Sequence, residues 1–159
     1  NNAAIRPEKP FLDTTDADWH RVLDVDLNAV FYGCRAALPG MVSNNWGRII
    51  NLTGMNAIHG YSGRAPVSVA KHGVWGLTKA LAKEFGPSGI TVNAISPGPI
   101  RPEHDDPIQS QHLHGQVGRI PLGHLGEPYH IASLCAYLIS EGGGFVSGQM
   151  IACNGAAET

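Results

Sequence analysis

The stretch Ile49–Lys71, IINLTGMNAIHGYSGRAPVSVAK, decides the fold. It begins with apolar and β-branched residues at 49–52, a composition typical of a buried strand. Gly54 and the stretch Gly60–Arg64 indicate a loop. From Pro66 onward the apolar residues recur at helical spacing and form one stripe, made of Ala70, Val74, Leu77, Leu81 and Phe85. A strand, a loop and a helix in this order predict a site beyond the carboxyl end of a strand in an open α/β sheet.

The residues that follow carry a resemblance to a known family. The segments NLTG and VSVAKHGVWGLTKALAKEFGPSGITVNAISPGPI are similar to the core of the short-chain dehydrogenase/reductase family. In that family the strand ends in a catalytic Ser, and the following helix carries a Tyr and, one turn later, a Lys. Aligned without gaps, the Lys falls on Lys71, the Tyr on Val67 and the Ser on Gly54.

The resemblance implies an NAD(P)-dependent oxidoreductase that moves hydride between a nicotinamide and a carbonyl or hydroxyl substrate. The family Tyr gives a proton to the substrate carbonyl, the Lys lowers the pKa of that Tyr and binds the ribose, and the Ser steadies the carbonyl oxygen. Val67 cannot donate a proton and Gly54 has no side chain. Lys71 is therefore the one member of this set carried over unchanged.

Two replacements for the missing acid are open. Tyr61 lies in the loop before the Lys71 helix, where it can serve as the acid or simply pack over the mouth of the site. The family Asn that kinks the preceding helix and holds a proton-relay water falls on Asp26, within Asp24–Leu27. A water held by Asp26 and Lys71 is the competing donor. The predicted catalytic residues are therefore Lys71, Tyr61 and Asp26.

The resemblance also implies a set of cofactor-binding positions. Pro97–Ile100 is similar to the Pro-Gly-x-Ile turn whose backbone meets the nicotinamide, while the family Thr that follows falls on Pro102. Asn1–Ala4 resembles the Asn-Asn-Ala-Gly motif after the fourth strand. The expected cofactor is NAD or NADP, with the choice left open, and its predicted contacts are Asn1, Ala3, Lys71, Pro97, Gly98 and Ile100.

The opening motif also sets the expected domain. We expect 1–159 to form a single α/β domain, the carboxyl-terminal part of a Rossmann-like doubly wound parallel sheet in three α/β/α layers, without the amino-terminal glycine-rich part. These residues alone are then expected to bind the cofactor weakly or not at all. The pattern predicts strands at 48–53, 90–96 and 148–153, and helices at 16–43, 66–86 and 127–140, the first capped by a residue of 13–16.

Composition limits the partners. The 159 residues carry a net charge of −2 and no basic run, which argues against nucleic acid. No apolar run approaches the length of a membrane span. Three widely spaced cysteines favour a reducing compartment, so a cytoplasmic protein is expected. Apolar residues beyond one helix face, among them Phe31, Trp75 and Leu81, predict a homodimer or homotetramer. The remaining partner is a small carbonyl or alcohol substrate.

Two other functions compete with the active oxidoreductase. The losses at positions 54 and 67 favour a catalytically degenerate relative that acts as a binding or structural subunit. A metal-dependent lyase or hydrolase is the third alternative, because Glu103–Asp106 with His112 and His114 offers metal-binding residue types. Their spacing matches no established metal site, so a solvated loop is favoured and no metal ligand is predicted. The substrate pocket is expected to be apolar around Ile58, Val67 and Leu113.

Overall fold

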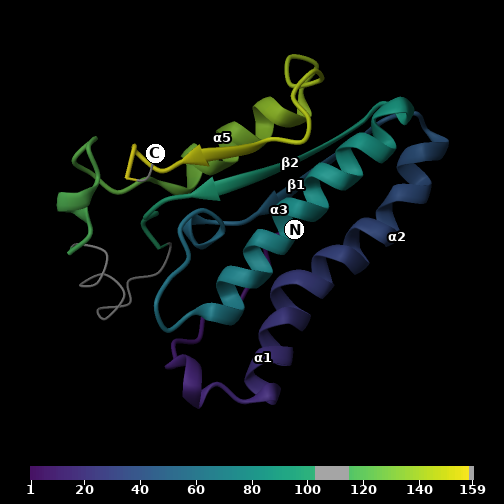
Figure 1. Ribbon diagram of the computed structural model, residues 1–159. Helices are drawn as coiled ribbons and strands as arrows, with labels where there is room; N and C mark the ends of the chain where they lie inside the picture. Colours follow the sequence, from purple (N-terminus) through teal and green to yellow (C-terminus); the bar gives the residue numbers. More distant parts are fainter. Residues whose placement is uncertain (103–114, 158–159) are drawn as a thin grey trace.

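The computed structural model describes residues 1–102 and 115–157 and centres on a parallel sheet of three strands. The strands β1 (Gly47–Leu52), β2 (Ile90–Pro97) and β3 (Met150–Cys153) lie side by side in that order (Figure 1). Ile49 pairs with Val92, and Ile95 pairs with Ile151. All three carboxyl ends therefore meet at one edge, as the sequence predicts.

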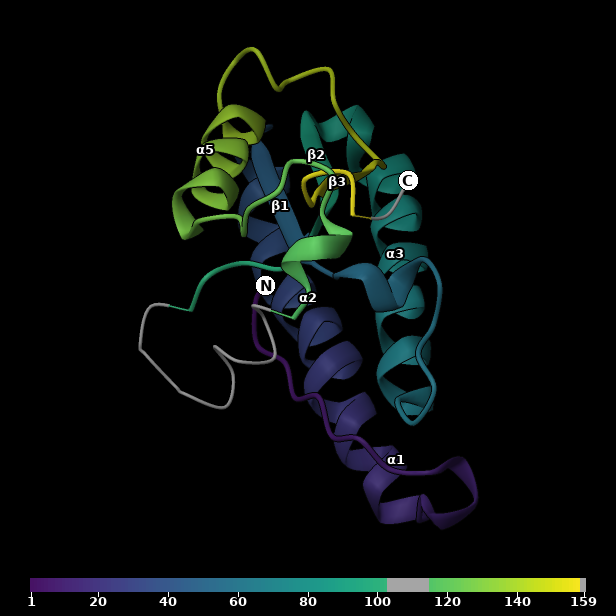
Figure 2. The same ribbon diagram turned by 90° about the vertical axis from the view of Figure 1, so that its left-hand side faces the viewer.

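Helices cover both faces of this sheet. One face carries α1 (Asp16–Leu23), a π-helical segment η2 (Asp24–Asn28), α2 (Ala29–Ser43) and α3 (Ala65–Phe85). The other face carries α5 (Pro128–Ile139), as Figures 1 and 2 show from two sides. Short 3-10 turns, η1 (Phe11–Asp13), η3 (Met55–Ala57), η4 (Gly86–Ser88) and η5 (Val117–Arg119), lie in the connections. The predicted three-layer α/β/α architecture is confirmed.

The first helix begins at a reciprocal cap. The Thr15 hydroxyl accepts a hydrogen bond from the Asp18 backbone N–H, and the Asp18 carboxylate accepts one from the Thr15 backbone N–H. Two N–H groups that a helix start leaves unpaired are thereby satisfied. The expectation that a residue of 13–16 caps this helix is confirmed, and the residue is Thr15.

The predicted helix 16–43 is one run with a π-helical segment inside it. That segment, η2, holds Asp26 with its side chain fully buried. One extra residue per turn swings the side chains of such a segment out of the helical register, and π-helical turns are frequent at functional sites. The Asp26 carboxylate accepts a hydrogen bond from the Ile5 backbone N–H of the amino-terminal segment at 2.8 Å.

The core lies between the sheet and the α2–α3 face. Strand β2 is buried along almost its whole length, which is what a central parallel strand requires. The buried core cluster is formed by Val30, Cys34, Leu38, Ile49, Val74, Ile90 and Val92. Leu77, Leu81 and Phe85 are partly buried and pack against it, so the stripe predicted on α3 faces the core. Leu81 thus contributes to packing within the subunit.

The junction between α2 and β1 depends on one close backbone approach. Gly89 sits after η4 with a φ of 71°, and a Cβ placed there would come within 2.5 Å of the Asn45 carbonyl oxygen. An L side chain meets both a strained backbone and a clash at this position. Glycine is therefore required for β2 to begin beside β1.

The element boundaries agree with the predicted ranges to within about two residues, the usual uncertainty of helix and strand ends. The residues predicted as a solvated loop with metal-binding types, Glu103–Asp106, His112 and His114, lie outside the described residues, as does Leu113. None of the helices in the described ranges combines the length and apolar character needed to cross a bilayer.

Candidate functional site

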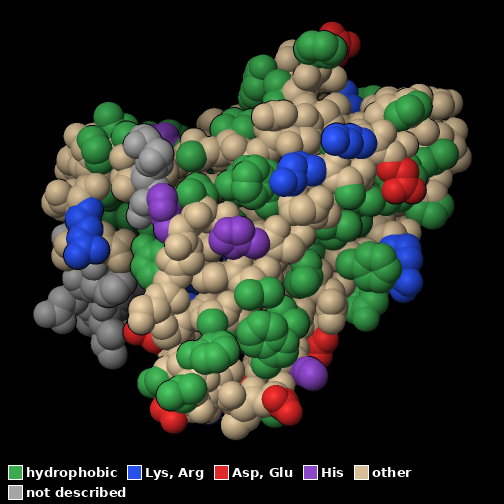
Figure 3. All heavy atoms as spheres, viewed as in Figure 1, with side chains coloured by type: hydrophobic (Ala, Val, Ile, Leu, Met, Phe, Trp, Pro, Cys, Tyr) green, Lys and Arg blue, Asp and Glu red, His purple; other side chains and the backbone are tan. Residues whose placement is uncertain are grey.

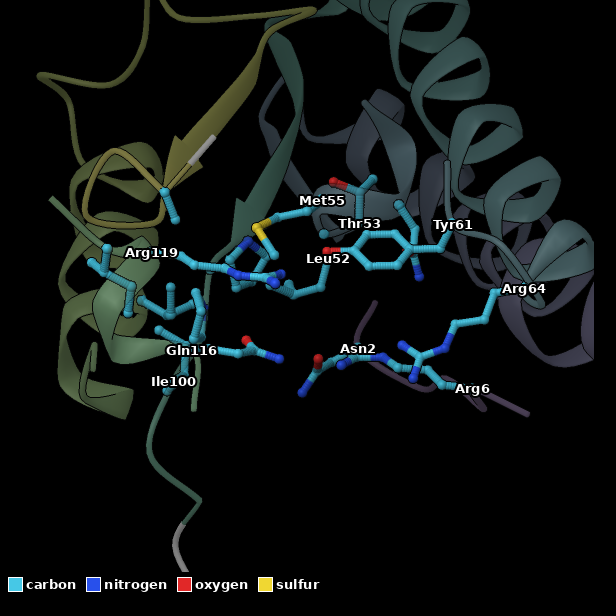
Figure 4. Close-up of a pocket in the computed structure, with 18 of the residues that line it drawn as sticks. Asn2, Arg6, Leu52, Thr53, Met55, Tyr61, Arg64, Ile100, Gln116 and Arg119 are labelled. Atoms are coloured by element: carbon cyan, nitrogen blue, oxygen red, sulfur yellow. The ribbon is translucent and has the colours of Figure 1, made fainter. Parts of the chain in front are cut away.

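A cavity of about 960 Å³ opens at the carboxyl ends of β1 and β2. Its walls come from four places: the amino-terminal segment, the loop after β1, the turn after β2, and the region from η5 to α5 (Figure 4). A volume of this size is at the upper end of the range for sites of small molecules and cofactors. The strand–loop–helix pattern predicted a site at this edge of the sheet.

Tyr61 reaches into this cavity. Its ring points toward Leu52 and Thr53 in Figure 4, and the residue is 43% exposed. The loop holds it through its backbone N–H, which donates to Ser68 Oγ at 3.2 Å, and the Arg64 guanidinium lies 5.8 Å from the ring centre. Tyr61 therefore offers a phenolic hydroxyl to the cavity.

The residues after β1 form the cavity floor without a catalytic hydroxyl in the expected place. Thr53 is nearly buried, and its hydroxyl donates to the Ile95 carbonyl oxygen at 3.0 Å. Gly54 adopts a φ of 111° and a ψ of 172°. That region of backbone space is reserved almost entirely for glycine. The backbone at position 54 is therefore in a conformation that a serine would occupy only under strain.

Asp26 and Lys71 form a buried ion pair behind the cavity. Nζ of Lys71 lies 3.6 Å from Oδ2 of Asp26, and it donates to the Leu52 carbonyl oxygen at 3.3 Å. Both side chains are almost completely shielded from solvent. Oδ2 makes no hydrogen bond among the described residues, so the ammonium is its nearest compensation. The structure brings together two of the three predicted catalytic residues.

The environment of Lys71 opposes its charge. Burial lowers the pKa of Lys71 below its ordinary value, the Asp26 carboxylate acts in the opposite direction, and the positive charge of Arg6 adds to the lowering. Asp26 is thus the group that favours the ammonium form. Neither Lys71 nor Asp26 lines the cavity, and Val67, which is fully buried, does not line it either.

The predicted cofactor contacts divide into two groups. Pro97, Gly98 and Ile100 line the cavity, whereas Asn1 and Ala3 do not. Asn1 instead hydrogen-bonds along β1: its backbone oxygen accepts from the Leu52 N–H at 2.9 Å, and its side chain donates to Asn51 Oδ1 at 2.7 Å. Of the opening motif, Asn2 is the residue on the cavity wall.

Three arginines on the cavity wall were missed by the sequence analysis. Arg6 and Arg64 approach from one side and Arg119 from the other, as Figure 4 shows. They are far apart in sequence, and none has another basic residue next to it, so no charge run marks them. Only the fold brings them to one space. The apolar pocket predicted around Ile58 and Val67 is wrong in this respect, since neither residue lines the cavity.

The described residues contain no group of three or more His, Cys, Asp or Glu side chains placed to hold a metal ion. The groups at or behind the cavity walls that can donate a proton or bind negative charge include the Tyr61 hydroxyl, the Asp26–Lys71 pair and the guanidinium groups. This arrangement suits proton donation and the binding of negative charge.

Comparison with known proteins places this site in a family. A family model described as enoyl-(acyl carrier protein) reductase matches residues 1–156. The acetoacetyl-CoA reductase of Cupriavidus necator is 40% identical over 155 residues, which are 98% of this chain and 63% of that protein. The 3-oxoacyl-[acyl-carrier-protein] reductase FabG of Pseudomonas aeruginosa is 36% identical over 155 residues, which are again 98% of this chain and 63% of that protein. The chain thus spans under two thirds of the length of these relatives.

Solved structures agree with the sequence comparison. A putative oxidoreductase from Escherichia coli superposes with a TM-score of 0.87 at 34% identity, over 99% of this chain and 61% of that one. A short chain dehydrogenase from Bacillus anthracis gives a TM-score of 0.86 at 33% identity, over 98% of this chain and 61% of that one. The parallel sheet, the cavity at its carboxyl edge and these matches together show that the chain belongs to the short-chain dehydrogenase/reductase family.

Proposed function

We propose that the full-length protein is a nicotinamide-dependent oxidoreductase that interconverts a small carbonyl compound and its alcohol. The observation that carries this proposal is the position of the cavity, at the carboxyl edge of the parallel sheet and against the Pro97–Ile100 turn. In open α/β sheets this edge is where ligands bind. The relatives named as reductases support the same chemistry.

The residues present fit the nicotinamide end of NAD or NADP. Pro97, Gly98 and Ile100 form one wall of the cavity. A Cβ at position 98 would come within 2.6 Å of the Asn154 Cα, so this position must be glycine for the turn to pack against Asn154. Bound there, the cofactor would supply or accept the hydride. We propose these three residues as its contacts, with Asn2 on the facing wall in place of the expected Asn1 and Ala3.

Tyr61 is the proposed proton donor. Its hydroxyl enters the cavity, whereas the buried Val67 at the family Tyr position offers no proton. The ammonium of Lys71 contacts Asp26 and the Leu52 carbonyl rather than the cavity, so its proposed role is to fix the floor behind the acid. A water held by Asp26 and Lys71 remains the alternative donor, because Oδ2 of Asp26 has spare acceptor capacity.

Mixing the full-length protein with NADH or NADPH and a panel of small ketones and aldehydes tests this proposal. Carbonyl-dependent loss of the reduced nicotinamide absorbance is expected, and it should vanish when the carbonyl compound or the protein is omitted. A full-length protein that binds NADH yet consumes none with any carbonyl would overturn the assignment as an enzyme.

A catalytically degenerate binding or structural subunit is the second candidate. It is favoured by one specific observation: Lys71, the retained family residue, is closed into an ion pair with Asp26 and does not line the cavity. In this case the cavity binds its ligand without turning it over. Ligand binding by calorimetry without any hydride transfer would support this candidate.

Association and location are proposed on separate grounds. Large apolar side chains remain exposed on α2 and α3, among them Phe31, Tyr32 and Val69, and Figure 3 shows hydrophobic side chains on that face. We propose that they meet the same helices of a second copy in a homodimer or homotetramer, with residues 1–159 in one domain. Sedimentation of the full-length protein as a monomer would contradict the association.

The free Cys34, Cys135 and Cys153 support a reducing compartment such as the cytoplasm.

A further inference from the structure

The cavity wall has the opposite charge balance to the chain. The 159 residues carry 11 basic Lys and Arg against 13 Asp and Glu. The described wall carries the basic residues Arg6, Arg64 and Arg119 and a single acid, Glu8. A concave surface lined by one sign of charge concentrates ligands of the other sign, because its walls focus the field.

One of these arginines is already neutralised. Both Nε and Nη2 of Arg64 donate to Oε2 of Glu8, at 3.3 and 2.9 Å. This pair ties the loop before α3 to the amino-terminal segment and leaves little free charge on Arg64. Within the described ranges, Arg6 and Arg119 have no comparable acidic partner, and both side chains are exposed to the cavity.

The two guanidinium groups enter from opposite walls. Arg6 belongs to the extended segment beside η2, and Arg119 ends the turn η5 on the far side (Figure 4). The positive charge of Arg6 also contributes to lowering the pKa of Lys71. A guanidinium presents several donors in a fixed plane that matches a carboxylate or phosphate. Two such groups on the walls of the cavity that Tyr61 also lines suit an anionic group on a bound ligand.

We propose that Arg6 and Arg119 bind a carboxylate or phosphate on the carbonyl substrate, so that the preferred substrates are small keto acids or phosphorylated ketones. The carbonyl half of this ligand rests on the proposed function, whereas the anionic half rests on the arginines alone. Thr53, Asn56 and Gln116 add neutral polar groups to the same wall, which leaves the guanidinium groups as its source of uncompensated charge.

Calorimetric titration of the full-length protein, in the absence of cofactor, measures the anionic half by itself. Pyruvate, its neutral methyl ester and inorganic phosphate are the probes. Pyruvate is expected to bind at least roughly tenfold more tightly than the ester, since hydrogen bonds to charged groups are worth more than neutral ones. Added salt should weaken the binding of pyruvate and of phosphate but not the binding of the ester. Whichever of pyruvate and phosphate binds more tightly identifies the group as carboxylate or phosphate.

Variants assign the effect to the two side chains. The double variant Arg6→Gln/Arg119→Gln should bring pyruvate and its ester to equal affinity. Arg35→Gln is the matched control, because it removes the same charge from α2, where Arg35 lies 4.8 Å from the Phe31 ring and outside the cavity. Arg6→Lys/Arg119→Lys provides a second, charge-conserving comparison, and it should retain part of the preference if the Gln variant fails to fold.

Three results would overturn the proposal. Equal affinity of the unaltered protein for pyruvate and methyl pyruvate would show that the protein does not recognise an anionic group. An acid preference that survives in the folded Gln double variant assigns it to other residues. Displacement of pyruvate by NAD⁺ in a one-for-one competition gives the arginines to the cofactor instead of the substrate. A failure of hydride transfer affects none of these titrations, so it bears on the proposed function alone.

Discussion

Oδ2 of Asp26 lies 3.6 Å from Nζ of Lys71, and both side chains are shielded from solvent behind the cavity floor. A buried charge without a partner is costly, so each member of this pair compensates the other. The pair therefore makes the identity of residue 26 depend on that of residue 71.

Removing either partner alone should destabilise the protein strongly. Asp26→Asn or Lys71→Met leaves one uncompensated charge, and we expect each to lower the free energy of unfolding by roughly 3–5 kcal/mol. The double variant Asp26→Asn/Lys71→Met should lose less than the two single losses combined. Denaturant unfolding of the four proteins gives the coupling energy.

The exposed pair Lys9–Asp18 is the matched control for this cycle. Its atoms are closer, at 2.7 Å, but both side chains are 42% exposed. Its coupling energy should be much smaller than that of the Asp26–Lys71 pair, because water screens such pairs. Strict additivity of the Asp26 and Lys71 changes would show that the two charges are compensated separately.

Much of this fold was predictable because local patterns agree with one another. The apolar stripe from Ala70 to Phe85 has helical spacing, and α3 buries that stripe against the sheet. The β-branched residues of 90–95 predicted a strand, and β2 is buried on both faces. Periodicity reports which face is buried, and parallel strands followed by helices leave few alternative topologies.

Replacement of Tyr61 separates the two candidate proton donors. If the Tyr61 hydroxyl gives the proton, Tyr61→Phe should lower turnover about 100-fold or more, with little change in stability because the ring remains. Tyr32→Phe on the exposed face of α2 is the control and should leave turnover unchanged. Steady-state kinetics of the full-length protein supply the measurement. An unchanged rate in Tyr61→Phe would point to the water held at Asp26.

The lowered pKa of Asp18 leads us to expect that the folded state loses stability in acid. Hydrogen bonds from Lys9 and from the Thr15 N–H and hydroxyl hold the pKa of Asp18 well below its ordinary value of 3.8. The folded state therefore keeps the carboxylate ionised where the unfolded chain already binds a proton. The resulting stabilisation is complete above that ordinary value and is lost as the pH falls toward the depressed pKa.

Thermal unfolding between neutral and strongly acidic pH tests this sign. Asp18→Asn should be less stable than the unaltered protein at neutral pH, and the gap should shrink as the pH falls below 3.8. Asp13→Asn, in the neighbouring turn η1, is the control for the loss of one carboxylate outside the cap. A gap that stays constant with pH would mean that the cap acts without its charge.

The close approach at Gly89 gives a sharp stability test. Gly89→Ala adds a Cβ that would lie 2.5 Å from the Asn45 carbonyl oxygen at a φ of 71°, and we expect a loss of about 2 kcal/mol or more. Gly76→Ala is the matched control, since nothing lies within 4 Å of the added methyl group and the site is helical. It should gain roughly 0.5–1 kcal/mol. Similar melting temperatures for the two variants would contradict the structure.

The site was less predictable than the fold because its walls are assembled across the chain. Arg6 and Arg119 meet the same space only after the amino-terminal segment and the turn η5 fold against the strand ends. The resemblance marked Asp26 and Lys71 as two residues that hold a water, and their direct ion pair was not predicted. The backbone of Gly54 carries no sequence signal beyond glycine itself, although it decides which residues that position accepts.

Placing the family Ser at position 54 and the family Tyr at position 67 should not increase carbonyl reduction. Val67 is fully buried, so Val67→Tyr must push aside packed neighbours at a cost of about 1–3 kcal/mol. Gly54→Ser meets open space but a φ of 111°, which costs a further 1–3 kcal/mol or so. The double variant should therefore melt at a lower temperature and reduce carbonyl compounds no faster than the unaltered protein.

The two single variants identify the cause. Gly54→Ser should lose stability without any steric contact, which isolates the backbone strain, whereas Gly54→Ala should lose nearly the same amount because its Cβ meets the same φ. Turnover that rises in Val67→Tyr/Gly54→Ser would mean that the backbone relaxes around the new side chains and that the site has merely lost two groups. A lower turnover of the same double variant, which still contains Tyr61, would mean that the buried Val67 supports a cavity whose proton donor is not the residue at position 67.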